Sequence, residues 1–410
     1  MRDHNLEIPP EPQNCPSLEN KNSTFKNKID DAAGFAVLPD FERFKQANDM
    51  FNRTLWDSSV QSKKAKAFFE AYTGGQTPIR KMSGFALKDY ALRNAAWHLA
   101  DFTAGLKEET EDRREGFLDS YSIQRPVSEH TQVVDSPGEM SRDIKRAAKF
   151  LGADLVGICE FDERWLYAQR YSRRSRRKKP LDLPTDLPYV IVIAVQMDHE
   201  LVQTNPSALS GAASGIGYSR QTLTLLSLAQ YIRNLGYGAI ASMNDTALTI
   251  PLAIAAGLGE YSRMGLLITK EFGPRVRLGK IFTNLPLTPD QPMRFGVKEF
   301  CEICQRCVKA CPMRAIFPGP PVDQPRNQSN LQGVRKWSID AEKCFHYWVN
   351  QNSECSICMR ACPYNKEYAK RYARIGRWLA GTLLRRVMLK LDGWLGFGQR
   401  RGAGWWWRKS

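Results

Sequence analysis

The chain has 410 residues, of which 42% are hydrophobic and 25% charged, and its formal net charge is +16. This composition excludes a wholly disordered chain, and no apolar run reaches the roughly 20 residues that a membrane-spanning helix needs. The N-terminus has no cationic start followed by an apolar stretch, so we read no export signal and expect a cytoplasmic protein.

Residues 1–35 are polar and expected to be mobile, and residues 36–135 are expected to pack on the core, with a helix at 85–105. Ser136 and Glu139 predict a capping box that opens a helix ending near Gly152. Further predicted strands are 154–159, 189–196, 237–242 and a strand pair at 265–270 and 277–284, and further predicted helices are 220–235 and 247–257. This alternation predicts a layered α/β domain over 136–295, followed by a cysteine module over 296–370 and a tail over 371–410.

The positive excess is concentrated in residues 173–179 and in the tail from Lys366. Such blocks attract anionic partners, and a solvated surface loop is the alternative for 173–179. The tail has tryptophans at 394 and 405–407 and an apolar stripe with helical spacing, whose members are Leu384, Val387, Met388, Leu391 and Leu395. Basic residues beside tryptophans suit an anionic lipid surface. We therefore expect peripheral contact with the inner membrane, and no binding to DNA; packing of the stripe on the protein's own core is the alternative.

Eight of the ten cysteines lie between residues 301 and 362, in two runs that each end in Cys-Pro. The first run has the C-x2-C-x2-C-x3-C-P spacing of a bacterial 4Fe–4S ferredoxin, whose fourth cysteine ligates the other cluster. The second run lacks its first cysteine, which Cys344 can supply. The predicted ligands are Cys301, Cys304, Cys307 and Cys362 for one cluster, and Cys311, Cys344, Cys355 and Cys358 for the other. Two zinc sites are the alternative, but zinc favours paired C-x2-C knuckles separated by longer loops.

The segments GYSRQT (217–222), NLGYGAIASMND (234–245) and 257–287, together with the cysteine module, resemble the corrinoid-dependent reductive dehalogenase family. LPDFERFKQANDMFNRTLWD (38–57) resembles the N-terminal part of that family. The resemblance implies a nitroreductase-like core of the α+β or α/β class that binds cobalamin base-off, with a ferredoxin-like module of two 4Fe–4S clusters. The implied cofactor site surrounds 256–263 and 281–287. Its expected contacts are Gly257, Gly259 and Arg263. The two glycines would let the backbone approach a large flat ring.

The implied reaction is reductive cleavage of a carbon–halogen bond in an organohalide, expected to be a haloaromatic, with release of halide. The resemblance implies that Tyr218 is the proton donor and that Arg277, ahead of Lys280, is its basic partner. It also implies that Asn244 is a polar residue facing the same pocket. A phenol with an ordinary pKa of about 10 keeps its proton at neutral pH, and a nearby cation stabilises the phenolate. The family match also leads us to expect a separate ferredoxin or flavodoxin as the electron donor.

Two other functions stay open on the sequence. An epoxyqueuosine reductase acting on tRNA, a relative with the same fold and cluster pair, fits the positive charge but expects an acidic proton donor. A non-catalytic electron carrier would use only the iron–sulfur clusters, and the large α/β domain would then have no function. Cobalamin content separates the carrier from both enzymes, and assays with haloaromatics or tRNA separate the two enzymes.

Overall fold

The computed structural model describes residues 34–72, 79–107, 127–172, 176–179, 181, 183 and 186–408. The expectations for residues 1–33, which include Cys15, and for 173–175 of the first basic block lie outside these ranges.

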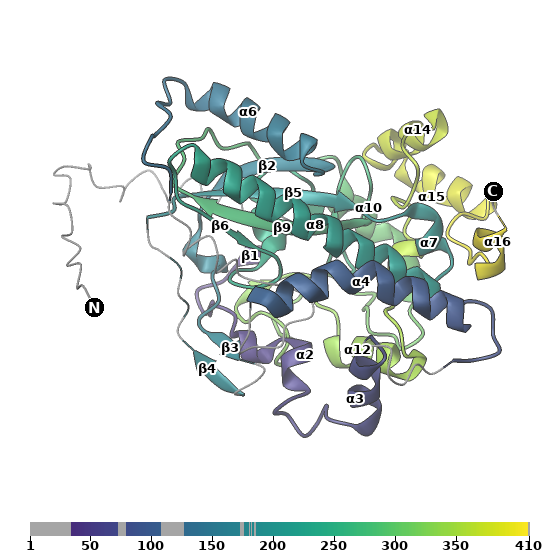
Figure 1. Ribbon diagram of the computed structural model, residues 1–410. Coiled ribbons are helices and arrows are strands. Elements are labelled where there is room, and N and C mark those ends of the chain that lie inside the picture. The colour runs from purple at the N-terminus through teal and green to yellow at the C-terminus, as the bar shows by residue number, and fades with distance from the viewer. Residues whose placement is uncertain are drawn as a thin grey trace.

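Helices and strands alternate through the middle of the chain (Figure 1). The helices are α2 (Met50–Arg53), α3 (Lys63–Glu70), α4 (Leu87–Lys107), α6 (Pro137–Phe150), α7 (His199–Gln203), α8 (Ala208–Asn234), α9 (Thr249–Ala255), α10 (Val297–Cys304), α11 (Arg306–Ala310), α12 (Ala341–Gln351), α13 (Ile357–Ala361), α14 (Arg371–Ala380), α15 (Arg385–Trp394) and α16 (Ala403–Trp407), with short 3-10 turns η1 (Gln46–Asn48) and η2 (Glu163–Trp165). The strands are β1 (Ala36–Val37), β2 (Leu155–Glu160), β3 (Arg170–Ser172), β4 (Arg177–Lys179), β5 (Tyr189–Gln196), β6 (Ala239–Ser242), β7 (Glu260–Tyr261), β8 (Leu267–Ile268), β9 (Val276–Thr283) and β10 (Val334–Arg335).

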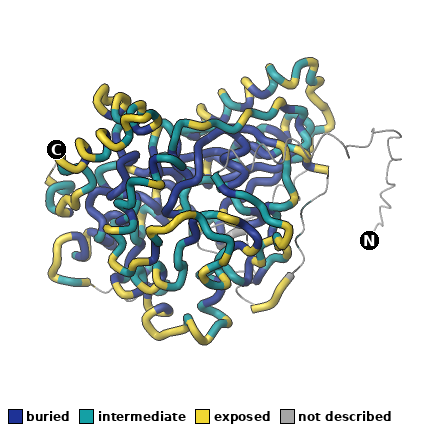
Figure 2. Tube along the Cα trace, turned by 180° about the vertical axis from the view of Figure 1, so that it is seen from behind, coloured by how far each residue is buried: buried dark blue, intermediate teal, exposed yellow. Residues whose placement is uncertain are grey.

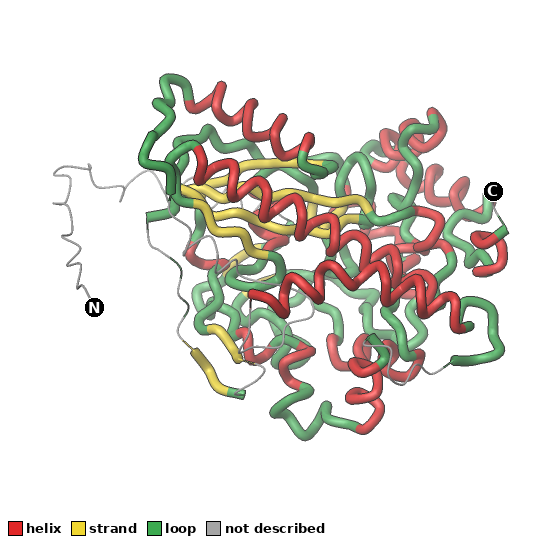
Figure 3. The backbone as a smooth tube through the Cα atoms, viewed as in Figure 1, coloured by secondary structure: helices red, strands yellow, loops and turns green. Residues whose placement is uncertain are grey.

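The core is a four-stranded sheet in the order β2–β5–β9–β6, and every neighbouring pair is antiparallel. Strand β5 is apolar throughout because both of its faces are covered. Ile191 and Ile193 belong to the core cluster that holds residues of α6 and α8, whereas Val190 and Val192 belong to the one that holds residues of α9. Figure 3 shows the long α8 lying across one face of the sheet. The core is therefore layered, as expected, around an antiparallel sheet.

The predicted pairing of 265–270 with 277–284 is wrong. Strand β9 lies in the main sheet between β5 and β6, whereas β8 pairs with β7 in a separate hairpin. Both segments are strands, but an apolar pattern does not encode which strand is the partner.

Helix α6 starts as predicted, because the Ser136 hydroxyl accepts a hydrogen bond from the backbone N–H of Glu139. Gly152 follows its end with a φ of 112°.

Helix α8 begins at Ala208, well before the predicted residue 220. The missed segment, ALSGAASGIG, is rich in glycine and serine, which have low helix propensity. Its glycines allow α8 to approach α4 closely, since a Cβ on Gly215 would lie 2.6 Å from Cδ1 of Trp97. Tertiary packing therefore extends this helix beyond what local propensity predicts.

Replacing Gly215 by alanine is expected to lower the free energy of unfolding by about 1–3 kcal/mol, because the new methyl group collides with Trp97. The matched control is Gly376→Ala in α14, where the Cβ would meet only Cε of Met388 at 3.7 Å. That change should be neutral or slightly stabilising, because alanine has the higher helix propensity. Thermal unfolding of the two variants measures the difference, and equal melting temperatures would refute the packing argument.

The N-terminal region packs on the cysteine module as well as on the core. Strand β1 pairs with β10, and Phe68 of α3 packs with Phe345 and Val349 of α12. Arg53, only 1% exposed, makes ion pairs of 2.7 Å with Asp57 and with Glu342. Hydrogen bonds from Ser59 and Arg53 lower the pKa of Asp57 to about 2.

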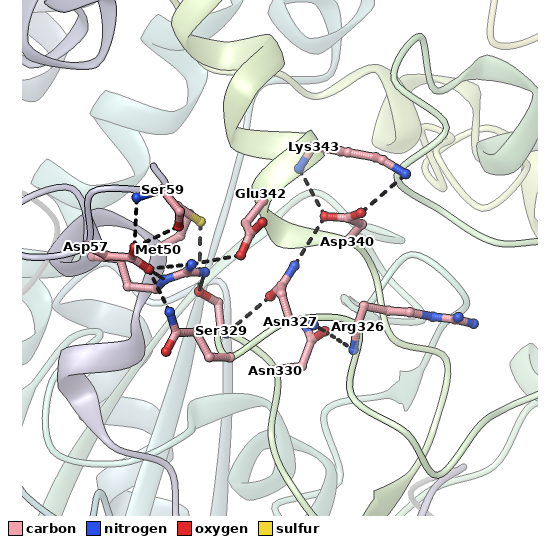
Figure 4. A network of polar contacts seen from close by, with 12 residues as sticks. Met50, Asp57, Ser59, Arg326, Asn327, Ser329, Asn330, Asp340, Glu342 and Lys343 are labelled. Atoms are coloured by element: carbon pink, nitrogen blue, oxygen red, sulfur yellow. Dashed lines mark hydrogen bonds and ion pairs between the residues drawn. The ribbon is translucent and has the colours of Figure 1, made fainter. Parts of the chain in front are cut away.

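A polar network continues into the loop before α12 (Figure 4). Arg53 donates to Oγ of Ser329, and the Asp340 carboxylate caps α12 by accepting from the backbone N–H of Lys343. Asn327 donates to the same carboxylate. Because α12 carries Cys344, this network fixes one predicted cluster ligand against the N-terminal region.

The C-terminal helices are docked on the body. Trp406 and Trp407 of α16 pack with Leu209 and Ala212 of α8, and the Trp407 indole donates to Asp89. Trp406 and Trp407 are thus partly buried against the body, as the alternative of packing on the protein's own core expects for the end of the tail. Within the described ranges, no helix is long and apolar enough to cross a membrane.

Candidate active site

A cavity of about 360 Å³ lies between the core sheet and the β7–β8 hairpin. This volume is in the range of small-molecule pockets, about 300–1,000 Å³. Its walls come from α8, the loop after β6, the start of α9, the β7–β8 hairpin and the start of β9. Segments that are distant in the chain therefore contribute side chains to one site.

Tyr218, Asn244 and Arg277, the three predicted catalytic residues, all line this cavity. The Asn244 side-chain amide donates a hydrogen bond of 2.9 Å to the Tyr218 hydroxyl oxygen. The Arg277 guanidinium lies over the Tyr218 ring, 5.0 Å from its centroid. Tyr218 itself is only 6% exposed. The phenol oxygen accepts from the amide, so the phenol keeps its own proton for donation.

Arg277 is held in place by α8. Its Nη2 donates to the Ser214 hydroxyl at 2.8 Å, and a Cβ on Gly217 would lie 3.0 Å from Cγ of Arg277. Its Nε is buried and has no hydrogen-bond partner among the residues that the structure describes. A cation fixed beside the phenol favours the phenolate form, so the geometry suits the role expected for Arg277.

Lys280 lies on the opposite face of β9 from Arg277. Its ammonium donates to the Met243 carbonyl at 2.6 Å and to the Thr249 hydroxyl at 3.1 Å. Burial lowers the pKa of Lys280 to about 7. Since neighbouring positions alternate between the faces of a strand, Lys280 supports the loop that carries Asn244. The preference for Arg277 over Lys280 as the partner of Tyr218 agrees with this geometry.

Two residues of the site were missed in the sequence. The Trp97 ring stacks on Tyr218 with centroids 4.8 Å apart and an interplanar angle of 27°. Its indole donates to Glu354 at 2.8 Å, and Glu354 is 6% exposed and precedes Cys355. This stack holds the plane of the tyrosine ring and links it to the cysteine module. Only the glycine-rich stretch 211–217 hinted at such close packing.

The two glycines predicted to approach a flat ring have another role. A Cβ on Gly259 would lie 2.1 Å from the Ile268 carbonyl oxygen, and one on Gly257 would lie 2.6 Å from the Gln291 carbonyl oxygen. Both glycines therefore pack against the protein's own backbone, and neither is among the described residues that line the cavity. Their expected contact with a corrinoid stays a prediction.

Arg263 lies against the cysteine module instead of the cavity. Its guanidinium donates to the backbone carbonyls of Cys301, Phe317 and Gly319, and it is 3% exposed. It lines a second, smaller cavity together with Cys301, Cys304, Cys307 and Cys362. Arg263 therefore lies beside one set of cysteines, and its expected contact with a corrinoid stays a prediction.

The β7–β8 hairpin separates the two cavities. Tyr261, Gly265 and Leu266 line the larger cavity, and Ser262, Arg263 and Met264 line the cavity of the cysteines. Only this hairpin therefore lies between the cavity lined by Tyr218 and the first predicted set of cluster ligands.

Within each predicted set the cysteines lie near enough for a charge on one thiol to raise the pKa of another, in addition to the larger effect of burial. Cys362 interacts with Cys301, Cys304 and Cys307, and Cys358 interacts with Cys344 and Cys311. Cys355 interacts with Cys358, Cys344 and Cys311. Cys307 and Cys358, one from each set, also interact, which places the two sets side by side.

Burial raises the pKa of Cys344, Cys358 and Cys307 to about 12. Such thiols need the positive charge of bound metal to become thiolates. In number and donor chemistry the eight free cysteines of this module fit two 4Fe–4S clusters, although no three such side chains among the described residues are already arranged around a metal position.

Residues 171–287 match the family model described as reductive dehalogenase subunit, and residues 300–365 match the 4Fe-4S double cluster binding domain. The tetrachloroethene reductive dehalogenase of Sulfurospirillum multivorans is 36% identical over 292 residues, which cover 65% of this chain and 58% of that protein. Its counterpart in Desulfitobacterium hafniense is 37% identical over 304 residues, covering 64% of this chain and 55% of that protein. This chain thus spans a little over half the length of these curated relatives.

Among solved structures, the catabolic reductive dehalogenase NpRdhA in complex with 3-bromo-4-hydroxybenzoic acid matches with a TM-score of 0.69 and 26% identity, covering 89% of this chain and 48% of that one. The epoxyqueuosine reductase of Aliivibrio fischeri is a more distant relative, 28% identical over 258 residues that cover 56% of this chain and 67% of that protein.

Proposed function

We propose that this chain, which is related to the reductive dehalogenases over its core and its cysteine module, itself reduces an organohalide and releases halide. One observation carries the proposal: Tyr218, Asn244 and Arg277 are assembled on a cavity that a single hairpin separates from four cysteines. The net reaction consumes two electrons and one proton, breaks the carbon–halogen bond and forms a carbon–hydrogen bond.

The cavity suits a corrinoid in a nitroreductase-like core. Aliphatic and aromatic side chains form much of its wall, and they would hold a large, mainly apolar ring: Trp165, Leu248, Ile250, Tyr261, Leu266 and Leu267. No histidine is among the described residues that line it, which fits base-off binding without a histidine ligand. When bound, reduced cobalamin supplies a low-valent cobalt that reacts with the carbon–halogen bond.

The chain's own residues manage the proton. Tyr218 donates it from its hydroxyl to the carbon that loses halogen, and the Arg277 guanidinium stabilises the resulting phenolate. Asn244 fixes the hydroxyl oxygen through its 2.9 Å hydrogen bond. Trp97, stacked on the ring, prevents the phenol from turning away from the cavity.

When bound, the two clusters would supply single electrons taken from an external donor. Cys301, Cys304, Cys307 and Cys362 would hold the cluster that lies behind the hairpin from the cavity, and Cys311, Cys344, Cys355 and Cys358 would hold the other. A small acidic ferredoxin or flavodoxin is the proposed donor. The described part of the first basic block, Arg176–Lys178, is exposed and offers it a complementary charge.

The test is a halide-release assay on protein reconstituted anaerobically with iron, sulfide and cobalamin and then reduced chemically. The relatives' printed names point to tetrachloroethene and to 3-bromo-4-hydroxybenzoic acid, so both are offered. We expect chloride or bromide to be released from at least one of them. Conversion of epoxyqueuosine in tRNA, without halide release from either compound, would favour the distant relatives' activity and overturn the proposal.

A further inference from the structure

Helices α14 and α15, the turn between them and Leu395 carry an unusual number of exposed apolar side chains, which together we call the α14–α15 surface. It holds nine of the twenty large apolar side chains that are exposed among the described residues: Tyr372, Ile375, Trp378, Leu383, Leu384, Val387, Leu391, Trp394 and Leu395. Leu383 is 95% exposed and Trp394 83%. Soluble proteins rarely leave such a concentration open to water without a binding role.

The surface is the fixed outer side of docked helices. Met388 of α15 and Ala380 of α14 are buried in the cluster that contains Phe300. Asp392 makes ion pairs of 2.5 Å with Arg306 and 2.7 Å with Lys366. Figure 2 shows yellow, exposed positions along these helices near the C-terminus. The apolar side chains are therefore held outward by the packing of their own helices.

The charge on this surface is of one sign. Arg371, Arg374, Arg386 and Lys390 are exposed on the same two helices. Asp392, the one acidic residue in α14 and α15, is 3% exposed and already paired with Arg306 and Lys366. Tryptophan and leucine surrounded by arginine and lysine are typical of helices that lie in the interface of an anionic bilayer. A second copy of the chain would bring like charges together across the interface, which argues against self-association through this surface.

We propose that the α14–α15 surface binds the anionic phospholipid surface of a membrane, with both helices lying in the interfacial layer. The tryptophans of α16 take no part, because Trp406 and Trp407 pack against the body. The proposal does not depend on which reaction the cavity supports. It identifies the outer faces of α14 and α15 as the lipid-binding element. Deleting the C-terminal helices is a poor test, because Asp392 and Trp407 also stabilise the body.

The experiment is co-sedimentation of the full chain with vesicles of phosphatidylcholine alone or mixed with phosphatidylglycerol, at low and high salt. The test variant is Trp378→Ser combined with Trp394→Ser, two exposed positions whose change should leave the fold intact. The matched control is Phe150→Ser at the end of α6, where the side chain is 88% exposed outside the α14–α15 surface. A charge variant, Arg386→Gln with Lys390→Gln, tests the electrostatic part.

We expect the wild-type chain and Phe150→Ser to sediment with phosphatidylglycerol vesicles at low salt and to be released by high salt. The tryptophan variant should lose at least tenfold in partitioning, and the charge variant should bind more weakly. Wild-type protein that stays in the supernatant at low salt would overturn the proposal. So would equal loss in Phe150→Ser, or sedimentation without vesicles, which would indicate self-association.

Discussion

Replacing Tyr218 by phenylalanine should reduce halide release by about 10²–10⁴-fold, the usual effect of removing a positioned proton donor. The phenylalanine ring can keep its stacking on Trp97, so the change removes the hydroxyl and leaves the packing in place. The measurement is halide release per cobalt, which corrects for any change in cofactor content.

The matched control is Tyr237→Phe. The Tyr237 hydroxyl donates to the Gln132 carbonyl at the surface, away from the cavity, so its removal should leave turnover unchanged. Arg277→Leu should also reduce turnover, because the phenolate would lose the cation that lies over its ring. A Tyr218→Phe variant with near wild-type turnover would show that another group delivers the proton.

Replacing Cys304 or Cys358 by serine should remove one cluster, which is about four irons per chain, because each thiol belongs to a different ligand set. Iron analysis and the absorption of the purified variants in the visible range measure the loss. Cys304→Ser should also stop electron delivery to the cavity, since its set lies behind the β7–β8 hairpin.

Cys159→Ala is the control for these changes. Cys159 is 2% exposed in the core, where burial raises the pKa of its thiol, so it is expected to be inert. It should keep the full iron content. Iron loss in Cys159→Ala, or full iron in both serine variants, would refute the proposed ligand sets.

The features that could be predicted from the sequence are those with a short-range physical cause. Strand β5 has the predicted bounds because its continuous apolar run must be covered on both faces. Helix α6 opens where Ser136 caps it. The cysteine spacing predicted that the two runs lie together, and cysteines of both runs pack in one cluster, because cluster geometry imposes that spacing.

The features that could not be predicted depend on partners distant in the chain. The first turns of α8 pack closely on α4 at Gly211 and Gly215, and the position of β9 depends on β5 and β6. Arg263 was expected beside the cofactor because the family resemblance implied a cofactor site around 256–263. The hairpin instead directs Arg263 toward the cysteines, while its neighbour Tyr261 faces the cavity. Tyr218, Asn244 and Arg277 were found through a family resemblance, and no local pattern marks them.

The most direct test of the whole account is metal analysis of the anaerobically reconstituted wild-type chain, together with its ultraviolet–visible spectrum. The eight cysteines predict about eight irons per chain, and the cavity predicts one bound corrinoid, which is one cobalt. Stoichiometric zinc with little iron would contradict the two clusters. Full iron with no cobalt retained after gel filtration would contradict the cobalamin site and leave an electron carrier as the better description.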